Sequence, residues 1–213
     1  GFENLQEGHT TGGITNMADP LRGRQLQTGA LTGMTAADLI TRFGEARAKK
    51  VAMQYRILMD KHAMKNKKAH RRLGLEFDQA DDLAKNSPAL VGELRMIHMC
   101  SQSDGACVMI FAGEEKAKSL CRQPAWIKDH VTVHREEMFG LFGDAPSLST
   151  HRHAARKLYK RCGIENPKAE IDVFEMYDPS SWWGVDWLGE FLLFDGDEHI
   201  KMIEDGEITI GGA

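Results

Sequence analysis

The chain has 213 residues, a formal net charge of -4 and a hydrophobic content of 42%. A chain of this length can bury roughly 70% of its unfolded surface, so it needs no disulfide framework to fold. The mild negative charge argues against nucleic acid as a partner, and the composition excludes a disordered chain.

The cysteines are scattered along the chain and form no Cys-x-x-Cys pair, which disfavours a zinc ribbon or a secreted scaffold. Reduced thiols favour a cytoplasmic location. No apolar run approaches the roughly 20 residues of a membrane span, and the start lacks a signal-peptide pattern. The first residue is Gly1 rather than Met, which leaves open a start further upstream.

The first half of the chain predicts loop and helix. Residues 1–37 are rich in glycine and threonine, which is typical of irregular chain. A helix-compatible stretch starts at Thr35, and a second helix is expected over about 45–63 because its apolar residues share one face. These apolar residues are Ala48, Val51, Ala52, Tyr55, Leu58 and Met59.

A basic cluster follows this second helix. Such a cluster in a mildly acidic protein creates a local positive field suited to the phosphate groups of a small anionic ligand. A solvated helix face is the alternative interpretation. The cluster comprises Lys61, Lys65, Lys67, Lys68, Arg71 and Arg72, with His62 and His70 between them.

The second half predicts alternating strands and helices. The expected strands are 106–112, 126–133 and 171–176, and a hairpin is expected to turn at Asp205-Gly206 between 202–203 and 208–210. The expected helices are 114–118, the stretch from Thr150 to Gly163, and the aromatic stretch after Pro179. This alternation predicts an α/β fold with a layered sheet.

Tyr177 and Asp178 lie where the last of these strands turns into a helix. Pro179 suits a first helical turn, and Ser180 and Ser181 are cap candidates. Ligands of open α/β sheets usually bind at the carboxyl ends of strands, so the phenol and the carboxylate are candidate site residues. The alternative is a Tyr packed on the sheet edge and an Asp that caps the next helix.

Other kinds of chemistry are less well supported. His151 and His153 would point about 200° apart on a helix, so they do not form a metal site together. Cys100 precedes a strand rather than a helix, which favours a buried structural thiol. Ser103 lacks a nucleophile elbow, and no glycine-rich nucleotide motif is present.

Four segments in order resemble one family. They are Gly1-Phe-Glu-Asn-Leu5, Cys100-Ser-Gln-Ser-Asp-Gly-Ala106 with Glu114-Glu-Lys-Ala-Lys118, Ile171-Asp-Val-Phe-Glu-Met-Tyr-Asp178, and Gly206 to Gly212. They are similar to motifs of thiolases of the sterol carrier protein X or lipid-transfer type. Each is weak alone, but the ordered set is specific and covers essentially the whole chain.

The resemblance implies part of a thiolase fold, with an inserted, mostly helical loop domain that holds coenzyme A. Residues 1–121 would then hold the end of the N-terminal half with the loop domain at about 6–95, and residues 122–213 the start of the C-terminal half. Candidate contacts to coenzyme A are Ser101 and Ser103 in the matched loop and Lys65, Lys68 and Arg71 in the basic cluster.

The chain also departs from this family. The acyl-accepting cysteine of such thiolases would lie upstream of Gly1, and their histidine and second cysteine segments downstream of Ala213. Tyr177 stands where they carry histidine, and Pro179-Ser180 replaces their Cys-Phe. The sequence is therefore expected either to be an internal piece or not to perform the full reaction alone.

The resemblance implies an acyltransferase that acts on acyl-CoA thioesters and makes or breaks the bond between the α and β carbons. Tyr177 would donate a hydrogen bond or act as acid or base, and Asp178 would orient it. Two alternatives are a retro-aldol lyase on a β-hydroxyacyl-CoA and a non-catalytic acyl-CoA or lipid-binding subunit. A homodimer is expected from the family, and a zinc-ribbon/OB-fold protein is a candidate partner.

Overall fold

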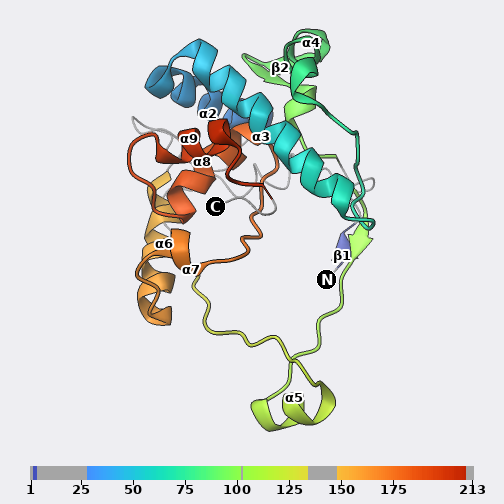
Figure 1. Cartoon of the computed structure of the whole chain (residues 1–213), viewed down its shortest axis with the longest axis vertical. Helices are drawn as coiled ribbons and strands as arrows, with labels where there is room; N and C mark the ends of the chain where they lie inside the picture. The colour runs from blue at the N-terminus through green and yellow to red at the C-terminus, as the bar shows by residue number, and fades with distance from the viewer. Residues whose placement is uncertain (1, 4–27, 102, 134–147, 210–213) are drawn as a thin grey trace, which may run out of the picture.

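The computed structural model describes residues 2–3, 28–101, 103–133 and 148–209 (Figure 1). Its main body is a group of helices: α2 (Thr28–Phe43), α3 (Glu45–Lys65), α6 (Leu148–Cys162), α8 (Ser181–Phe191) and α9 (Glu198–Asp205). Shorter elements are η1 (Phe77–Gln79), α4 (Ala80–Asn86), η2 (Met96–His98), α5 (Glu114–Leu120) and α7 (Pro167–Glu170). None of the helices in these ranges is long and apolar enough to cross a membrane.

The core forms where α3 and α8 meet. In α3 the buried Val51, Tyr55 and Leu58 recur at helical spacing, and they pack in one cluster with Trp182 and Val185 of α8. Val51 and Trp182 have no exposed surface. Full burial of one aliphatic side chain stabilises a fold by about 1.5–3 kcal/mol, so Val51, Leu58 and Val185 each add stability on this scale.

Glycines and a serine set the helix ends. Gly44, with φ 84°, separates α2 from α3, and Gly163, with φ 68°, follows α6. Such positive φ angles cost glycine little. Ser180 caps α8, because its Oγ accepts a hydrogen bond from the Trp183 amide at 3.3 Å.

Several predicted helices are confirmed. The helix expected over 45–63 is α3, the one over 114–118 is α5, and the one from Thr150 to Gly163 is α6. The helix expected from Thr35 begins earlier, at Thr28, so the loop predicted over 1–37 is wrong from there on. Residues 4–27 of that loop lie outside the described ranges. Thr35 therefore lies inside α2 rather than at its start, and its Oγ accepts a hydrogen bond from the Trp183 indole at 2.8 Å.

The strands form two small antiparallel sheets. One pairs β1 (Phe2–Glu3) with β4 (Gly105–Ala106), and the other pairs β2 (Ala89–Val91) with β3 (Leu94–Arg95). The described residues therefore have a mixed α/β structure in which helices predominate. The predicted α/β class is confirmed at this level.

The strands expected over 106–112, 126–133 and 171–176 are not formed, apart from Ala106 in β4. Within the described residues these segments have no neighbouring strand, and a strand is stable only when its backbone groups are paired. Their apolar side chains face solvent: Val108 is 88% exposed, Ile110 89% and Val173 76%. The first two segments flank α5, which lies apart from the helical body (Figure 1).

The hairpin expected at Asp205-Gly206 is also wrong. Met202 and Ile203 belong to α9, and Gly206 takes a left-handed conformation, with φ 74°, as the cap of that helix. The reason is burial, because Ile200 and Ile203 lie on one face of α9 and join the main core. A glycine in the left-handed conformation is common both at the C-terminal end of a helix and in a hairpin turn. Residue 210 lies outside the described ranges.

Asp60 of α3 holds the loop that follows this helix. Its buried carboxylate accepts hydrogen bonds from the backbone amides of Leu73 and Leu75, both at 2.9 Å. Burial raises the pKa of Asp60, but these hydrogen bonds and Arg56 outweigh it and lower the pKa overall. The carboxylate therefore stabilises the fold above the unfolded pKa of about 3.9, and this contribution is lost as pH falls through the lowered folded pKa.

We expect Asp60→Ala to lower the free energy of unfolding by about 2–3 kcal/mol, because it leaves two backbone donors without their acceptor. Urea denaturation at pH 7 measures this. The control is Asp172→Ala, which removes an exposed carboxylate. Equal stability of the two variants would contradict the role assigned to Asp60.

Candidate functional site

A cavity of about 250 Å³ collects polar side chains from three parts of the chain. We call it the Asp178 pocket. Helix α3 and the loop after it contribute Tyr55, Arg56, Met59, His70 and Arg71. The end of η2 and the chain after it contribute His98, Met99, Cys100, Ser101 and Ser103. Asp178 precedes α8, and Ser181 is the first residue of that helix.

Tyr55 and Asp178 form the central contact of this pocket. The Tyr55 hydroxyl donates a hydrogen bond to Oδ2 of Asp178 at 2.9 Å. Gly184 makes this contact feasible, because a Cβ at that position would lie 2.3 Å from Cε1 of Tyr55 and 2.7 Å from its hydroxyl. The ring of Tyr55 therefore packs directly on the backbone of α8.

The protonation equilibria of this pair are shifted together. Burial raises the pKa of Asp178, and the hydrogen bond from Tyr55 only partly opposes this rise. Burial also raises the pKa of Tyr55, and the charge of Asp178 adds to the effect. The phenol thus stays a hydrogen-bond donor, while the carboxyl group binds a proton more readily than an ordinary aspartate.

Backbone contacts bring the Cys100 loop to the start of α8. The Cys100 amide donates to the Pro179 carbonyl at 2.9 Å, and Met99 forms an isolated antiparallel bridge with Ser180. Arg71 fixes the same loop, since its Nη1 donates to the Met99 carbonyl at 2.9 Å. Residues about 80 positions apart are thereby held at one cavity.

Cys100 is exposed overall, so the buried thiol predicted from the sequence is wrong. Desolvation on its pocket side nevertheless raises the pKa of the thiol, and the charge of Asp178 raises it further. A thiol with a raised pKa is a poor nucleophile at neutral pH. We therefore do not assign Cys100 a covalent role.

Ser103 has a partner that the sequence did not reveal. Its Oγ lies 2.7 Å from Nδ1 of His70, and both side chains are exposed at the edge of the pocket. Tyr55 and Arg56 were missed as well, because a tyrosine on the apolar face of a helix indicates core packing. Nothing in the local sequence links either residue to Asp178.

The predicted site residues divide into three groups. Asp178, Ser101, Ser103 and Arg71 line the Asp178 pocket. Lys65 and Lys68 are exposed and are not among its lining residues. Tyr177 is 69% exposed and lines a different cavity.

This other cavity, of about 630 Å³, is mainly apolar. We call it the Tyr177 cavity. It lies between α6, the segment 171–177 and α8, and its wall includes Leu158, Phe174, Trp187 and Phe191. His151 packs on the last two rings, with centroid distances of 4.6 and 5.0 Å. Burial lowers the pKa of His151, so its ring is neutral near pH 7 and suits an apolar wall.

The side chains of His151 and His153 lie in different surroundings. His151 lines the Tyr177 cavity, whereas His153 is exposed on the same helix. Across the described ranges no group of three His, Cys, Asp or Glu side chains is arranged to hold a metal ion.

Comparison with known proteins gives one informative similarity. The chain is 28% identical over 156 residues to an acetyl-CoA acetyltransferase of Methanocaldococcus jannaschii, a match that covers 72% of this chain and 38% of that protein. The chain thus spans well under half the length of this relative. No family model matches the chain.

This similarity supports the thiolase superfamily that the sequence motifs indicate. It does not distinguish the sterol carrier protein X type from other thiolases. The mixed α/β structure is consistent with part of a thiolase fold.

The Tyr55–Asp178 hydrogen bond makes a direct prediction. We expect Tyr55→Phe to raise the pKa of Asp178, because the variant removes a hydrogen bond that favours the carboxylate. Carbon-13 NMR of the labelled aspartate side chains, recorded as a function of pH, measures this.

Tyr159→Phe is the matched control. It removes a hydroxyl that donates to the Phe191 carbonyl at 2.8 Å, away from Asp178. If the Asp178 titration in Tyr55→Phe is the same as in the control, the hydrogen bond does not set this pKa.

Proposed function

We propose that the protein is part of a thiolase-like acyltransferase that acts on acyl-CoA thioesters, with the thioester end held at the Asp178 pocket. One observation carries this proposal. Asp178 belongs to one of the four segments that resemble thiolase motifs, and Cys100, Ser101 and Ser103 belong to another; all four residues line the same cavity. The similarity to an acetyl-CoA acetyltransferase supports acyl-CoA as the substrate class.

The pocket has groups suited to stabilise charge on a thioester oxygen. Enolate formation next to a thioester places negative charge on the carbonyl oxygen, and donors aimed at that oxygen lower the barrier. The guanidinium group of Arg56 lines the pocket as a donor, whereas the Tyr55 hydroxyl gives its one proton to Asp178. In our proposal Arg56 has the donor role, and Asp178, oriented by Tyr55, exchanges a proton with the substrate.

Tyr177 has a different role in this arrangement. In an extended chain successive side chains point to opposite sides, and Tyr177 and Asp178 line different cavities. We propose that the acyl chain contacts the apolar wall of the Tyr177 cavity, next to Trp187. The acid/base role predicted for Tyr177 remains a separate hypothesis.

Arg71 is the proposed contact to the phosphates of coenzyme A at the pocket. The half-buried Arg71 is fixed by Met99, so its guanidinium loses little freedom when it binds an anion. Lys65 and Lys68 are exposed and lie a few residues before Arg71 in the sequence. In our proposal they add a long-range positive field. The expected homodimer and the zinc-ribbon/OB-fold partner remain predictions.

A retro-aldol lyase acting on a β-hydroxyacyl-CoA is the second candidate. The raised pKa of Asp178 favours it, because a carboxylate of this kind is suited to take the proton of a β-hydroxyl group. The same pocket would then stabilise the enolate that leaves. The two reactions differ in their products, which an assay separates.

The test compares the complete reading frame with its Asp178→Asn variant in assays of thiolysis and of aldehyde or ketone release from acyl-CoA substrates. We expect the variant to lower kcat by roughly 10²-fold or more in whichever reaction the protein catalyses, because it removes the proton-exchanging group. Asp172→Asn, at an exposed position, is the control. Activity within twofold of wild type in both assays would refute the role of Asp178.

Arg71→Gln tests binding rather than chemistry. We expect it to raise KM for the acyl-CoA about tenfold while kcat changes much less, since a phosphate contact made equally in the ground and transition states affects KM alone. Lys65→Gln is the control for general loss of positive charge. An equal change of KM in both variants would show that Arg71 makes no specific phosphate contact. A thermal melt checks that the loop remains folded.

A further inference from the structure

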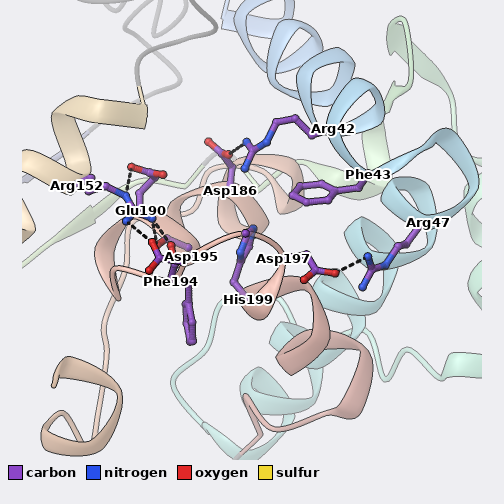
Figure 2. A pocket seen from close by; sticks show the side chains of 12 residues that line it. Arg42, Phe43, Arg47, Arg152, Asp186, Glu190, Phe194, Asp195, Asp197 and His199 are labelled. Atoms are coloured by element: carbon purple, nitrogen blue, oxygen red, sulfur yellow. Dashed lines mark hydrogen bonds and ion pairs between the residues drawn. The ribbon is translucent and has the colours of Figure 1, made fainter.

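A third cavity, of about 600 Å³, shares no lining residue with the two described above. We call it the Asp186 cavity. It is bounded by the end of α2, the start of α3, the start of α6, the second half of α8, and the turn 192–197 that leads into α9. Figure 2 shows its side chains converging from these elements.

Three arginines from three helices line this cavity, and each is paired with an acid (Figure 2). Nη1 of Arg42 lies 3.2 Å from Oδ1 of Asp186 and 3.0 Å from Oδ2 of Asp38. Arg47 lies 2.8 Å from Asp197 and 2.7 Å from Glu204. Arg152 contacts Glu190 at 3.3 Å and Asp195 at 3.5 Å. The last contact is long, and Asp195 has a 93% exposed side chain, so a bound anion can replace it at little cost.

The cavity also contains buried polar atoms that lack partners. Asp186 is 2% exposed, and its Oδ2 has no hydrogen-bond partner among the described residues. His199 is 3% exposed, and neither of its ring nitrogens has a partner in those ranges. Native proteins rarely leave buried polar side chains unsatisfied, so three such atoms at one cavity point to a ligand.

Gly189 leaves room for the His199 ring against the backbone of α8. A Cβ at position 189 would lie 2.9 Å from Cγ and Nδ1 of His199, so only glycine lets the ring pack there. Phe43 packs edge-on against the same ring, with a centroid distance of 5.9 Å. Contacts on both sides hold the imidazole in place.

The charges inside the cavity favour a donor-rich interior. Burial raises the pKa of Asp186 to about 8, against the opposing effect of Arg42 and with support from Glu190 and Asp38. The carboxyl group therefore carries a proton at neutral pH and acts as a donor. Burial lowers the pKa of His199 to about 4, to which Arg42, Arg152 and Arg47 contribute while Asp197 opposes them. The neutral ring offers one donor and one acceptor.

We propose that the Asp186 cavity binds a small ligand through an oxyanion group, held by the guanidinium groups of Arg42 and Arg152 and by hydrogen bonds from Asp186 and His199. The oxyanion is a tetrahedral phosphate-like group or a planar carboxylate. Guanidinium groups suit both, because their N–H donors are spaced to contact two oxygens. This site is independent of the acyl-CoA function, since none of these residues lines the Asp178 pocket.

The probes are sulfate and acetate, titrated into the intact protein by calorimetry at constant ionic strength with chloride. Neither anion changes its charge between pH 6 and 9, so any pH dependence comes from the protein. We expect at least one of them to bind with a Kd below about 10 mM. Arg42→Gln should weaken this binding at least tenfold, whereas the control Arg161→Gln, whose guanidinium pairs with Asp129 elsewhere, should not.

The pH dependence adds a readout that a purely structural role of Arg42 would not give. Protonated Asp186 donates to the anion and loses that proton as pH rises through about 8, so affinity should fall between pH 7 and pH 9. In Asp186→Asn, whose amide donates at every pH, the affinity should stay constant over this range.

Tighter binding of sulfate would identify a phosphate-like ligand, and tighter binding of acetate would identify a carboxylate. Nitrogen-15 NMR of the unsubstituted protein provides a test that needs no variant, because the His199 ring signals should shift on saturation. The absence of binding by both anions overturns the proposal. So does equal weakening in Arg42→Gln and Arg161→Gln, or binding that leaves the His199 signals unmoved.

Discussion

Burial of α8 on nearly every side is the constraint on which the rest of the structure depends. Trp182 and Val185 face the core that α3 provides, and eight of the eleven residues of the helix are buried. A helix that is apolar around its circumference is stable only when other elements enclose it. Helices α2, α3, α6 and α9 all pack against it.

The same enclosure explains why the three cavities surround this one helix. Ser181 lies at the Asp178 pocket, and Gly184, one turn later, receives the Tyr55 ring. Trp187 and its i+4 neighbour Phe191 line the Tyr177 cavity, while Asp186, with its i+3 and i+4 neighbours, lines the Asp186 cavity. Residues three and four apart share a helix face, so each face of α8 serves a different cavity.

Polar contacts fix the rotation of α8. The Trp182 indole donates to Nδ1 of His98 at 3.1 Å, and the Trp183 indole donates to Thr35 at 2.8 Å. Buried indoles need such partners. Burial lowers the pKa of His98 to about 4, with help from Arg95, so the ring is neutral near pH 7 and able to accept this bond. The contacts tie α8 to the loop that carries Cys100 and to α2.

Local patterns in the sequence were enough to predict α3 and α6, because the spacing of apolar residues and a terminal glycine act within one helix. The segments 107–112 and 171–176 were different, since their pairing depends on strands that the described residues do not supply. Asp178 was predicted as a site residue because it lies just before an expected helix. Tyr55 was not, because its partner is 123 residues away. Asp186 and His199 were missed for the same reason, since a cavity formed by five elements leaves no local pattern.

Two aspartates with raised pKa values, eight residues apart, have different partners. Asp178 is half-buried and accepts a hydrogen bond from a neutral phenol, so it is suited to take up a proton from a molecule in the pocket. Asp186 is almost fully buried and lies beside the Arg42 guanidinium, whose charge only partly offsets the cost of burying a carboxylate. A proton on Asp186 leaves Asp38, 3.0 Å from the same guanidinium, as its carboxylate partner. The first arrangement suits proton transfer to a substrate, and the second suits binding of an anion, because the protonated carboxyl group donates beside a guanidinium.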